Sequence, residues 1–380
     1  MFKIGDLPII RQPFQNELIT SWLDRVASVY GLSWSRLSNE IGDRAQSIGD
    51  YKATPGQISF LAKMTRMEKG VIRALDLARK FPGQPVERFQ CHPDTKLSAP
   101  DFCLECFHDD FSCGRDNYFR HEWAVAGVSH CHIHGTLLRS ACAICNEASS
   151  LAMMISNGRV QVYCKACGEA IRRSKNVWHS PSYVLRDDII AFETKLFRSL
   201  NSLKPRRKIP FRIVDDIAFL YFCADLPKSA SACKKLLFGW SDGACRASKL
   251  TRPLRENWLF DGAYLNPLGT VDASYRCALI EASIAIFENI TEGVRFWGRR
   301  NTYREASLQG LFEALNDAGR EELVSRANGW PKYLREQVRG IVNAPRSTSE
   351  FSRYYLRKGW FVSDARLAVN RGEMPKYSHF

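Results

Sequence analysis

Apolar residues recur at helical spacing near the start of the chain. Leu18, Trp22, Val26 and Val29 lie three or four positions apart after the loop Pro8 to Asn16. One face of an α-helix has this period, so the pattern predicts an amphipathic helix in this segment.

A second helix is predicted to begin at Thr54-Pro55-Gly56-Gln57, because this segment has a capping-box sequence with proline at the first helical position. A third helix is expected over Glu68 to Lys80, after a break near residues 65–67. Two short helices separated by three or four residues fit a helix-turn-helix, which many proteins use to bind DNA. Small helical bundles that bind no nucleic acid have the same periodicity, so both interpretations remain open.

The second half of the chain also has a helical pattern. In the segment Asp187 to Leu203, the apolar residues Ile190, Leu196, Phe197 and Leu200 share one side of a helix. A capping-box sequence at Ser347 to Glu350 predicts the start of another helix. Helical periodicity also recurs in Ile213 to Ala224, Ala273 to Ile290, Leu308 to Ala318 and Tyr333 to Val342.

The chain has thirteen cysteines. An odd number, in a chain without the pattern of a secretion signal, argues against a disulfide framework, because cytosolic thiols are kept reduced. Two residues between two ligands let one tight turn direct both side chains to one metal ion. Four pairs have this spacing: Cys103 and Cys106, Cys131 and His134, Cys142 and Cys145, and Cys164 and Cys167.

Taken in order, the four pairs predict two metal sites. The first site has 24 residues between its halves, the second has 18, and seven residues separate the sites. A catalytic zinc ion usually keeps one position open, whereas each of these sites has four protein ligands. The sequence therefore predicts two structural Zn²⁺ ions. Competing ligands for the first site are His108, His130, His132, Cys91 and Cys113.

Local sequence fits this prediction. Gly135 and Gly168 directly follow a predicted ligand, and glycine can adopt the positive φ that such turns need. Arg159 to Tyr163 alternates like a short strand that leads into Cys164. The other cysteines lie in apolar helical segments and are interpreted as core residues: Cys223, Cys233, Cys245 and Cys277.

The fold class predicted from these patterns is mainly α. It comprises an N-terminal helix-turn-helix domain over residues 1–90, tandem zinc ribbons with short strands over residues 91–180, and an all-helical domain over residues 181–380.

The formal net charge of +14, concentrated in the second half of the chain, favours a polyanionic partner such as DNA. A solvated basic surface that only keeps the protein soluble is the alternative. The residues expected to contact phosphate are Lys204, Arg206, Arg207, Lys208, Arg299 and Arg300.

Catalytic motifs are absent: the sequence has no phosphate-binding loop, nucleophile elbow or HExxH helix. Two adjacent acidic pairs, Asp109-Asp110 and Asp215-Asp216, are interpreted as surface charge, because neighbours in a helix point to different faces. No apolar run is long enough to span a membrane, and the first residues do not match a secretion signal. We therefore expect the protein in the cytosol or nucleoid, with no membrane association.

Several motifs together resemble the TniQ/TnsD family. The first runs from Leu7-Pro8 through Glu17 to Arg25, with Ser21-Trp22-Leu23 at its centre. The second joins the first four predicted ligands to Arg120, Trp123 and the His134-Gly135 turn. Asn328 to Pro331 is similar to the C-terminal part of the family. Proline usually follows the ligating cysteine in the family, whereas this chain has Leu104 and His132.

The resemblance implies a non-catalytic adaptor that selects targets in DNA transposition. Such an adaptor links a DNA site, read directly or through an RNA-guided CRISPR effector complex, to an AAA+ transposition regulator of the TnsC/TniB type. Some relatives form head-to-tail homodimers, so the resemblance also implies a homodimer for this chain. One alternative is a zinc-containing helix-turn-helix transcription regulator, and another is a nuclease with an unrecognised acidic site.

Overall fold

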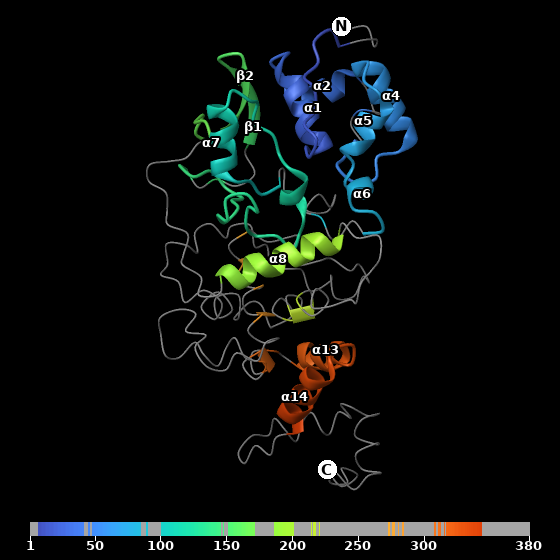
Figure 1. The fold of residues 1–380 in the computed structure, drawn as a ribbon, viewed down its shortest axis with the longest axis vertical. Helices are drawn as coiled ribbons and strands as arrows, with labels where there is room; N and C mark the ends of the chain where they lie inside the picture. The colour runs from blue at the N-terminus through green and yellow to red at the C-terminus, as the bar shows by residue number, and fades with distance from the viewer. Residues whose placement is uncertain are drawn as a thin grey trace. The chain divides into compact units, whose positions relative to one another are not determined.

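The computed structural model describes residues 7–41, 45, 48–84, 89, 100–145, 147, 151–171, 186–200 and 317–343, with single positions within 214–220, 273–284 and 308–315. The chain divides into two compact units, residues 1–208 with 244–277, and residues 209–243 with 278–380. The first unit contains all labelled elements from α1 to α8 (Figure 1). The predicted domain boundaries at residues 90 and 180 both fall inside it and stay predictions.

Five helices lie at the start of this unit, and four of them, α1, α2, α4 and α5, share one apolar core. Trp22 and Leu23 from the first helix pack there with Trp34, Leu61 and Ile72 from later helices. Trp34 belongs to a helix that was not predicted, since its short sequence carries few apolar residues. The predicted helix around Trp22 is confirmed. The five helices are α1 (Ile19–Ser28), α2 (Trp34–Ile41), α4 (Pro55–Thr65), α5 (Lys69–Ala74) and α6 (Leu77–Lys80).

The predicted capping box at the start of α4 is confirmed. Oγ1 of Thr54 accepts a hydrogen bond from the backbone N–H of Gln57, and Oε1 of Gln57 accepts one from the N–H of Thr54. The helix ends where Arg66 adopts a left-handed conformation with φ of 55°. The predicted break near residues 65–67 therefore lies at this residue.

The single helix predicted from Glu68 to Lys80 is wrong, because the structure has the two short helices α5 and α6. Asp76 lies between them, and its carboxylate accepts a hydrogen bond from the N–H of Ala78 in the first turn of α6. The same carboxylate also accepts hydrogen bonds from the N–H groups of Lys52 and Ala53. A side chain that binds backbone amides in this way favours a helix start over a helix interior.

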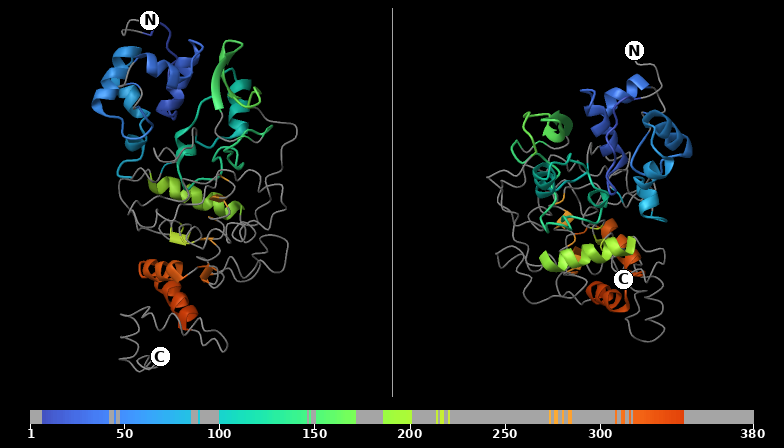
Figure 2. Two further views of the ribbon diagram at one scale, coloured as in Figure 1. Left: turned by 180° about the vertical axis from the view of Figure 1, so that it is seen from behind. Right: turned by 45° about the horizontal axis from the view of Figure 1, so that its top comes forward.

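A helix, a short 3₁₀ helix and a β-hairpin follow α6 in the first unit. Helix α7 is Leu104–Ser112, the short 3₁₀ helix η2 is His121–Ala124, and strands β1 (Leu151–Ser156) and β2 (Arg159–Cys164) pair antiparallel. Strand β2 confirms the predicted strand. In both views of Figure 2 these elements, coloured teal and green, lie beside the blue helices α1 to α6.

Helix α8 (Arg186–Leu200) confirms the predicted helix from residue 187 as far as the described residues extend. The second unit contains α13 (Asp317–Ala327), which was not predicted, and α14 (Lys332–Asn343), which confirms the helix predicted at Tyr333 to Val342. The helices predicted over 213–224, 273–290 and 308–318 are described only at single positions, and the capping box at 347–350 lies outside the described residues.

In the second unit, Asp216 corrects a sequence interpretation. The sequence predicts surface charge at this position, but only 1% of Asp216 is exposed. Its carboxylate accepts a hydrogen bond of 2.7 Å from Nη1 of Arg326 and one of 2.9 Å from Nε1 of Trp330. These donors compensate for burying the charge. The side chain of Asp215 lies outside the described residues.

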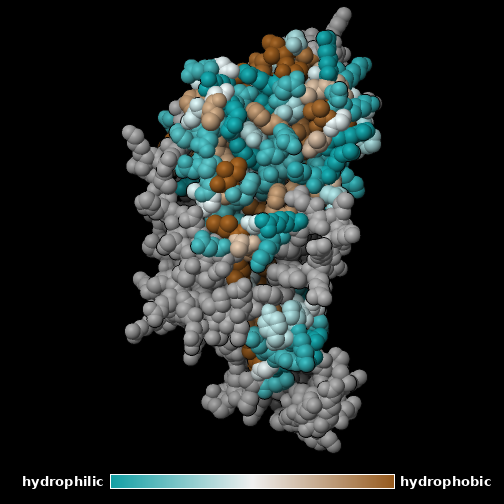
Figure 3. Space-filling view, viewed as in Figure 1, coloured by the Kyte–Doolittle hydropathy of each residue, from teal (hydrophilic) through white to brown (hydrophobic). Residues whose placement is uncertain are grey.

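The described part of the chain is helix-rich with a few short strands, in agreement with the coarse fold prediction. The helix-turn-helix and the all-helical C-terminal domain stay predictions. No helix in this part is both long and apolar enough to cross a membrane. On the face drawn in Figure 3, the coloured surface is mostly hydrophilic, and the hydrophobic areas are small and separate.

Candidate metal centre

The structure brings Cys103, Cys106, Cys131 and His134 together, and we call these residues the first cluster. Their ligand atoms all lie within 4.8 Å of one another. The Sγ atoms of Cys106 and Cys131 are 3.6 Å apart, and Nδ1 of His134 lies 3.3 to 3.6 Å from the three sulfur atoms. Tetrahedral zinc with Zn–S bonds of about 2.3 Å places two sulfur ligands about 3.8 Å apart. The distances therefore fit one tetrahedral ion.

Two local structures present the first cluster. Cys103 is the N-cap residue of α7, and its sulfur accepts a hydrogen bond from the N–H of Cys106 in the first turn. The second pair lies in a tight turn, where the N–H of Gly135 donates to the carbonyl of Cys131 over 2.7 Å. Gly135 has φ of 59°, as predicted from its position after His134.

His134 has a hydrogen-bonding partner on its second nitrogen. Nε2 lies 2.9 Å from Oδ2 of Asp109, which belongs to α7. If Nε2 carries the proton, Nδ1 is left as the lone-pair donor that faces the sulfur atoms. A carboxylate in this place fixes the tautomer and the orientation of a metal-binding imidazole.

The four remaining predicted ligands form the second cluster: Cys142, Cys145, Cys164 and Cys167. Their sulfur atoms also lie within 4.8 Å of one another. The Sγ atoms of Cys142 and Cys167 are 3.8 Å apart, and those of Cys145 and Cys164 are 3.5 Å apart. The sequential pairing inferred from the sequence therefore agrees with the geometry of both clusters.

The β-hairpin carries half of the second cluster. Cys164 is the last residue of β2 and pairs with Leu151 at the start of β1. The N–H of Gly168 donates to the carbonyl of Cys164, and Gly168 has φ of 75°, as predicted. At the other end, Asn157 and Gly158 both have positive φ and join the strands. An Asn-Gly pair between two apolar runs is a strong hairpin signal, and it could have predicted β1.

The thiols of the first cluster compete for protons. Hydrogen bonds from Cys103 and Cys106 lower the pKa of Cys131 to about 3, whereas hydrogen bonds with Cys103 and Cys131 raise the pKa of Cys106. The thiolate of Cys131 is thus stabilised at the expense of that of Cys106. A divalent cation stabilises all of the thiolates together, because metal binding releases their protons.

The competing ligands named from the sequence are not part of either cluster in the described residues. His130 is buried and lies 3.0 Å from Oγ of Ser129 through Nδ1, and His132 stacks on Phe197. His108 and Cys113 are exposed, and Cys113 is a free thiol. Cys91 lies outside the described residues. Among the cysteines interpreted as core, Cys277 is buried, and Cys223, Cys233 and Cys245 lie outside the described residues.

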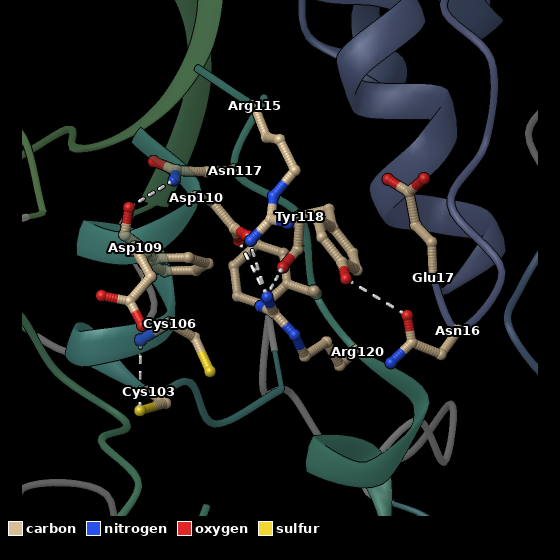
Figure 4. A network of polar contacts seen from close by, with 12 residues as sticks. Asn16, Glu17, Cys103, Cys106, Asp109, Asp110, Arg115, Asn117, Tyr118 and Arg120 are labelled. Carbon is tan, nitrogen blue, oxygen red and sulfur yellow. Dashed lines mark hydrogen bonds and ion pairs between the residues drawn. The ribbon is translucent and has the colours of Figure 1, made fainter. Parts of the chain in front are cut away.

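The interpretation of Asp109-Asp110 as surface charge is wrong for Asp110, which is fully buried. Nη2 of Arg120 lies 3.1 and 2.9 Å from its two carboxylate oxygens, and Arg115 lies 3.1 Å away (Figure 4). The guanidinium of Arg120 also stacks over the rings of Tyr118 and Trp123. Burial raises the pKa of Asp110, although the two arginines oppose this effect. The two neighbours do point to different faces of α7, and only Asp110 faces the interior, whereas Asp109 is exposed.

A second buried ion pair connects α1 to the segment that follows α7. Arg25 donates from Nε and Nη2 to the carboxylate of Glu17 over 2.7 and 2.6 Å, and from Nη1 to Asp116 over 2.9 Å. Burial alone would lower the pKa of Arg25, but Glu17 and Asp116 outweigh this effect and raise it. Such bidentate contacts fix geometry as well as charge.

The residues predicted to contact nucleic acid all lie outside the described residues: Lys204, Arg206, Arg207, Lys208, Arg299 and Arg300. Their role stays a prediction.

Residues 8–138 match the family model of TniQ. This match identifies a TniQ domain in the N-terminal part of the chain. The matched segment runs from the loop before α1 to Leu138 and contains the whole first cluster. The second cluster and α8 lie beyond the TniQ segment. No curated protein matches the chain.

Proposed function

We propose that this TniQ-family protein is a non-catalytic target-selection adaptor in DNA transposition, and that two structural zinc ions stabilise it. The match of residues 8–138 to TniQ carries the proposal, because this segment includes the buried Arg25 and Arg120 networks and a complete four-ligand cluster. The adaptor would link a chosen DNA site to an AAA+ transposition regulator. An RNA-guided complex or DNA itself would supply the site.

The donor atoms support zinc as the metal. Three thiolates with one imidazole, and four thiolates, are both ligand sets of structural zinc sites. Each cluster has four protein ligands at tetrahedral spacing, so no position would remain for a substrate. Asp109 supports His134 as outer-shell carboxylates do in zinc proteins.

Zinc would contribute folding free energy where the chain has little apolar core. The residues between the ligands in the two tight turns include Ile133 and Ile144, which are 57% and 56% exposed. Without the ions, hydrogen bonds and one hairpin would have to order these turns. Metal binding can replace a hydrophobic core in segments of this kind.

The surface of α4 and α5 supports a polyanionic partner. Lys63, Lys69 and Arg73 are exposed and pair with no carboxylate in the described part of the chain. Lys69 and Arg73 are one helical turn apart, so both point to the same side of α5. This side would meet DNA phosphates if α4 and α5 act as a helix-turn-helix.

Metal content tests the zinc part of the proposal. Elemental analysis of the full chain, purified without chelators, should give two zinc ions per chain. The variant Cys142→Ser with Cys164→Ser should retain one. Absence of zinc, or unchanged zinc and unchanged unfolding in the double variant, would refute this part.

Recruitment tests the adaptor part. The zinc-loaded chain, attached to a support, should retain an AAA+ transposition regulator of the TnsC/TniB type in the presence of ATP. The salt dependence of DNA binding should weaken by about one unit of slope for each phosphate-binding cation removed, as in Lys69→Ala with Arg73→Ala. Lys195→Ala, an exposed cation of α8, is the control. Tight binding to one operator without ATPase retention would favour a transcription regulator, and magnesium-dependent nicking would favour a nuclease.

A further inference from the structure

A carboxylate of α8 binds the backbone directly in front of the first cluster. Oε1 of Glu193 accepts a hydrogen bond of 2.8 Å from the N–H of Ser129 and another from its hydroxyl group. Oε2 accepts one of 3.0 Å from the N–H of His130, the residue before Cys131. Only 5% of Glu193 is exposed. These three donors compensate for burying the carboxylate and fix the backbone that leads into Cys131.

Apolar contacts on the same side of α8 reinforce this attachment. Phe197, one turn after Glu193, stacks on the ring of His132 at 6.2 Å between centroids and 10° between planes. A Cβ atom at Gly127 would overlap the side chain of Leu196, so the backbone approaches α8 closely at this point. Glu193, Leu196 and Phe197 therefore contact successive parts of residues 127–132.

The loop that receives these contacts is the one that carries Cys131 and His134. The N–H of Leu138 donates to the carbonyl of Ser129, and the N–H of Cys131 donates to the carbonyl of Thr136. Glu193 binds the outer edge of this loop, so any movement of α8 displaces the backbone next to a ligand.

We propose that Glu193 is a positioning residue for the first metal site, and that docking of α8 and metal binding by Cys103, Cys106, Cys131 and His134 are coupled. The inference rests on the proposed metal binding of the first cluster. Glu193 lies beyond the TniQ segment, so an element outside that segment stabilises a site inside it. Because coupling is reciprocal, metal release at the first cluster must also loosen α8.

Release of Co²⁺ tests the effect of Glu193 on the site. A site with three thiolates and one imidazole has a different Co²⁺ absorption spectrum from one with four thiolates, so the two clusters can be followed separately in one chain. With a chelator in excess, Glu193→Gln should release Co²⁺ from the imidazole-containing site at least about tenfold faster, because the backbone next to Cys131 loses its charge-assisted hydrogen bonds. Release from the second cluster should stay unchanged.

Asp187→Asn is the matched control, since it removes an exposed carboxylate from the same helix. It should behave like the unaltered protein. Equal release rates at the first cluster in both variants would overturn the inference. If the unaltered chain binds neither Zn²⁺ nor Co²⁺ at the first cluster, the proposed metal binding itself fails.

Hydrogen exchange tests the reverse direction without altering Glu193. Residues 186–200 should exchange faster in His134→Ala than in the unaltered protein, whereas α14 in the other compact unit should not change. This arm still decides the question if Glu193→Gln does not fold. Unchanged protection of α8 after the first site has lost its metal would refute the coupling.

Discussion

Nε2 of His134 lies 2.9 Å from Oδ2 of Asp109, and Nδ1 of the same ring faces the three sulfur atoms of the first cluster. We expect Asp109→Ala to weaken zinc binding at this cluster by about 10- to 100-fold, because the ring loses the partner that fixes its tautomer. Competition with a chelator of known affinity measures the change. His108→Ala, on an exposed position of the same helix, should have little effect. Equal affinities in the two variants would contradict the role of Asp109.

The buried carboxylate of Asp110 has one buried and one exposed arginine partner, which allows a matched comparison. The side chain of Arg120 is 5% exposed and that of Arg115 is 52% exposed. Arg120→Ala should lower the free energy of unfolding by about 3–5 kcal/mol, because Asp110 would lose its buried counter-charge. Arg115→Ala should cost less than about 1 kcal/mol. Urea denaturation of both variants measures the difference, and similar losses would argue against this assignment.

Asp50 should make stability depend on pH. Burial, with smaller contributions from the nearby Asp24 and Asp76, raises its pKa from 3.8 to about 6, although hydrogen bonds from Thr20 oppose this increase. The folded state therefore binds this proton more tightly than the unfolded state. Its contribution is full below about pH 4, and about 3 kcal/mol should be lost as the pH rises through about 6.

Asp50→Asn should remove this contribution, because an amide can still bind the N–H and the hydroxyl of Thr20 but cannot ionise. The quantity to measure is the difference in unfolding free energy between variant and unaltered protein at pH 4, 5, 6 and 7. As the pH rises, Asp50→Asn should become more stable relative to the unaltered protein. Asp187→Asn should show no such trend, and a constant difference for Asp50→Asn would contradict the assignment.

Two glycines with open space around them should respond in opposite directions to alanine. Gly158 has φ of 74° in the hairpin turn, and no atom lies within 4 Å of an added Cβ. Gly158→Ala should therefore destabilise by about 1 kcal/mol through backbone strain alone. Gly70 lies in α5 with equally open space, and Gly70→Ala should stabilise by up to about 1 kcal/mol. Thermal unfolding of both variants measures the sign of each effect.

The sequence predicted the local parts of the metal centre. Cys103 and Cys106, like the other pairs, are candidate ligands held together by one turn, so their spacing alone predicts that they converge. The positive φ of the glycines after His134 and Cys167 was also predicted from the sequence, because this backbone conformation depends on a single residue in the turn.

Contacts between segments that are distant in the sequence could not be predicted from the local sequence. Asp110 looks like any exposed acid until Arg120 is placed beside it, and Asp216 until Arg326 and Trp330 are. Glu193 is separated from Ser129 by 64 positions, and nothing in its local sequence indicates a partner. The break between α5 and α6 could have been predicted from the sequence, because Asp76 is a residue type that commonly starts a helix.

The antiparallel bridge between Glu17 and Arg120 has a practical consequence for anyone who divides this protein. The N–H of Leu18 donates to the carbonyl of Phe119, and the N–H of His121 donates to the carbonyl of Asn16. In a fragment that ends before residue 100, α1 would lack these hydrogen bonds, and Arg25 would lack the counter-charge of Asp116. The N-terminal helices should therefore express poorly by themselves, and a shortened version should extend past the η2 helix.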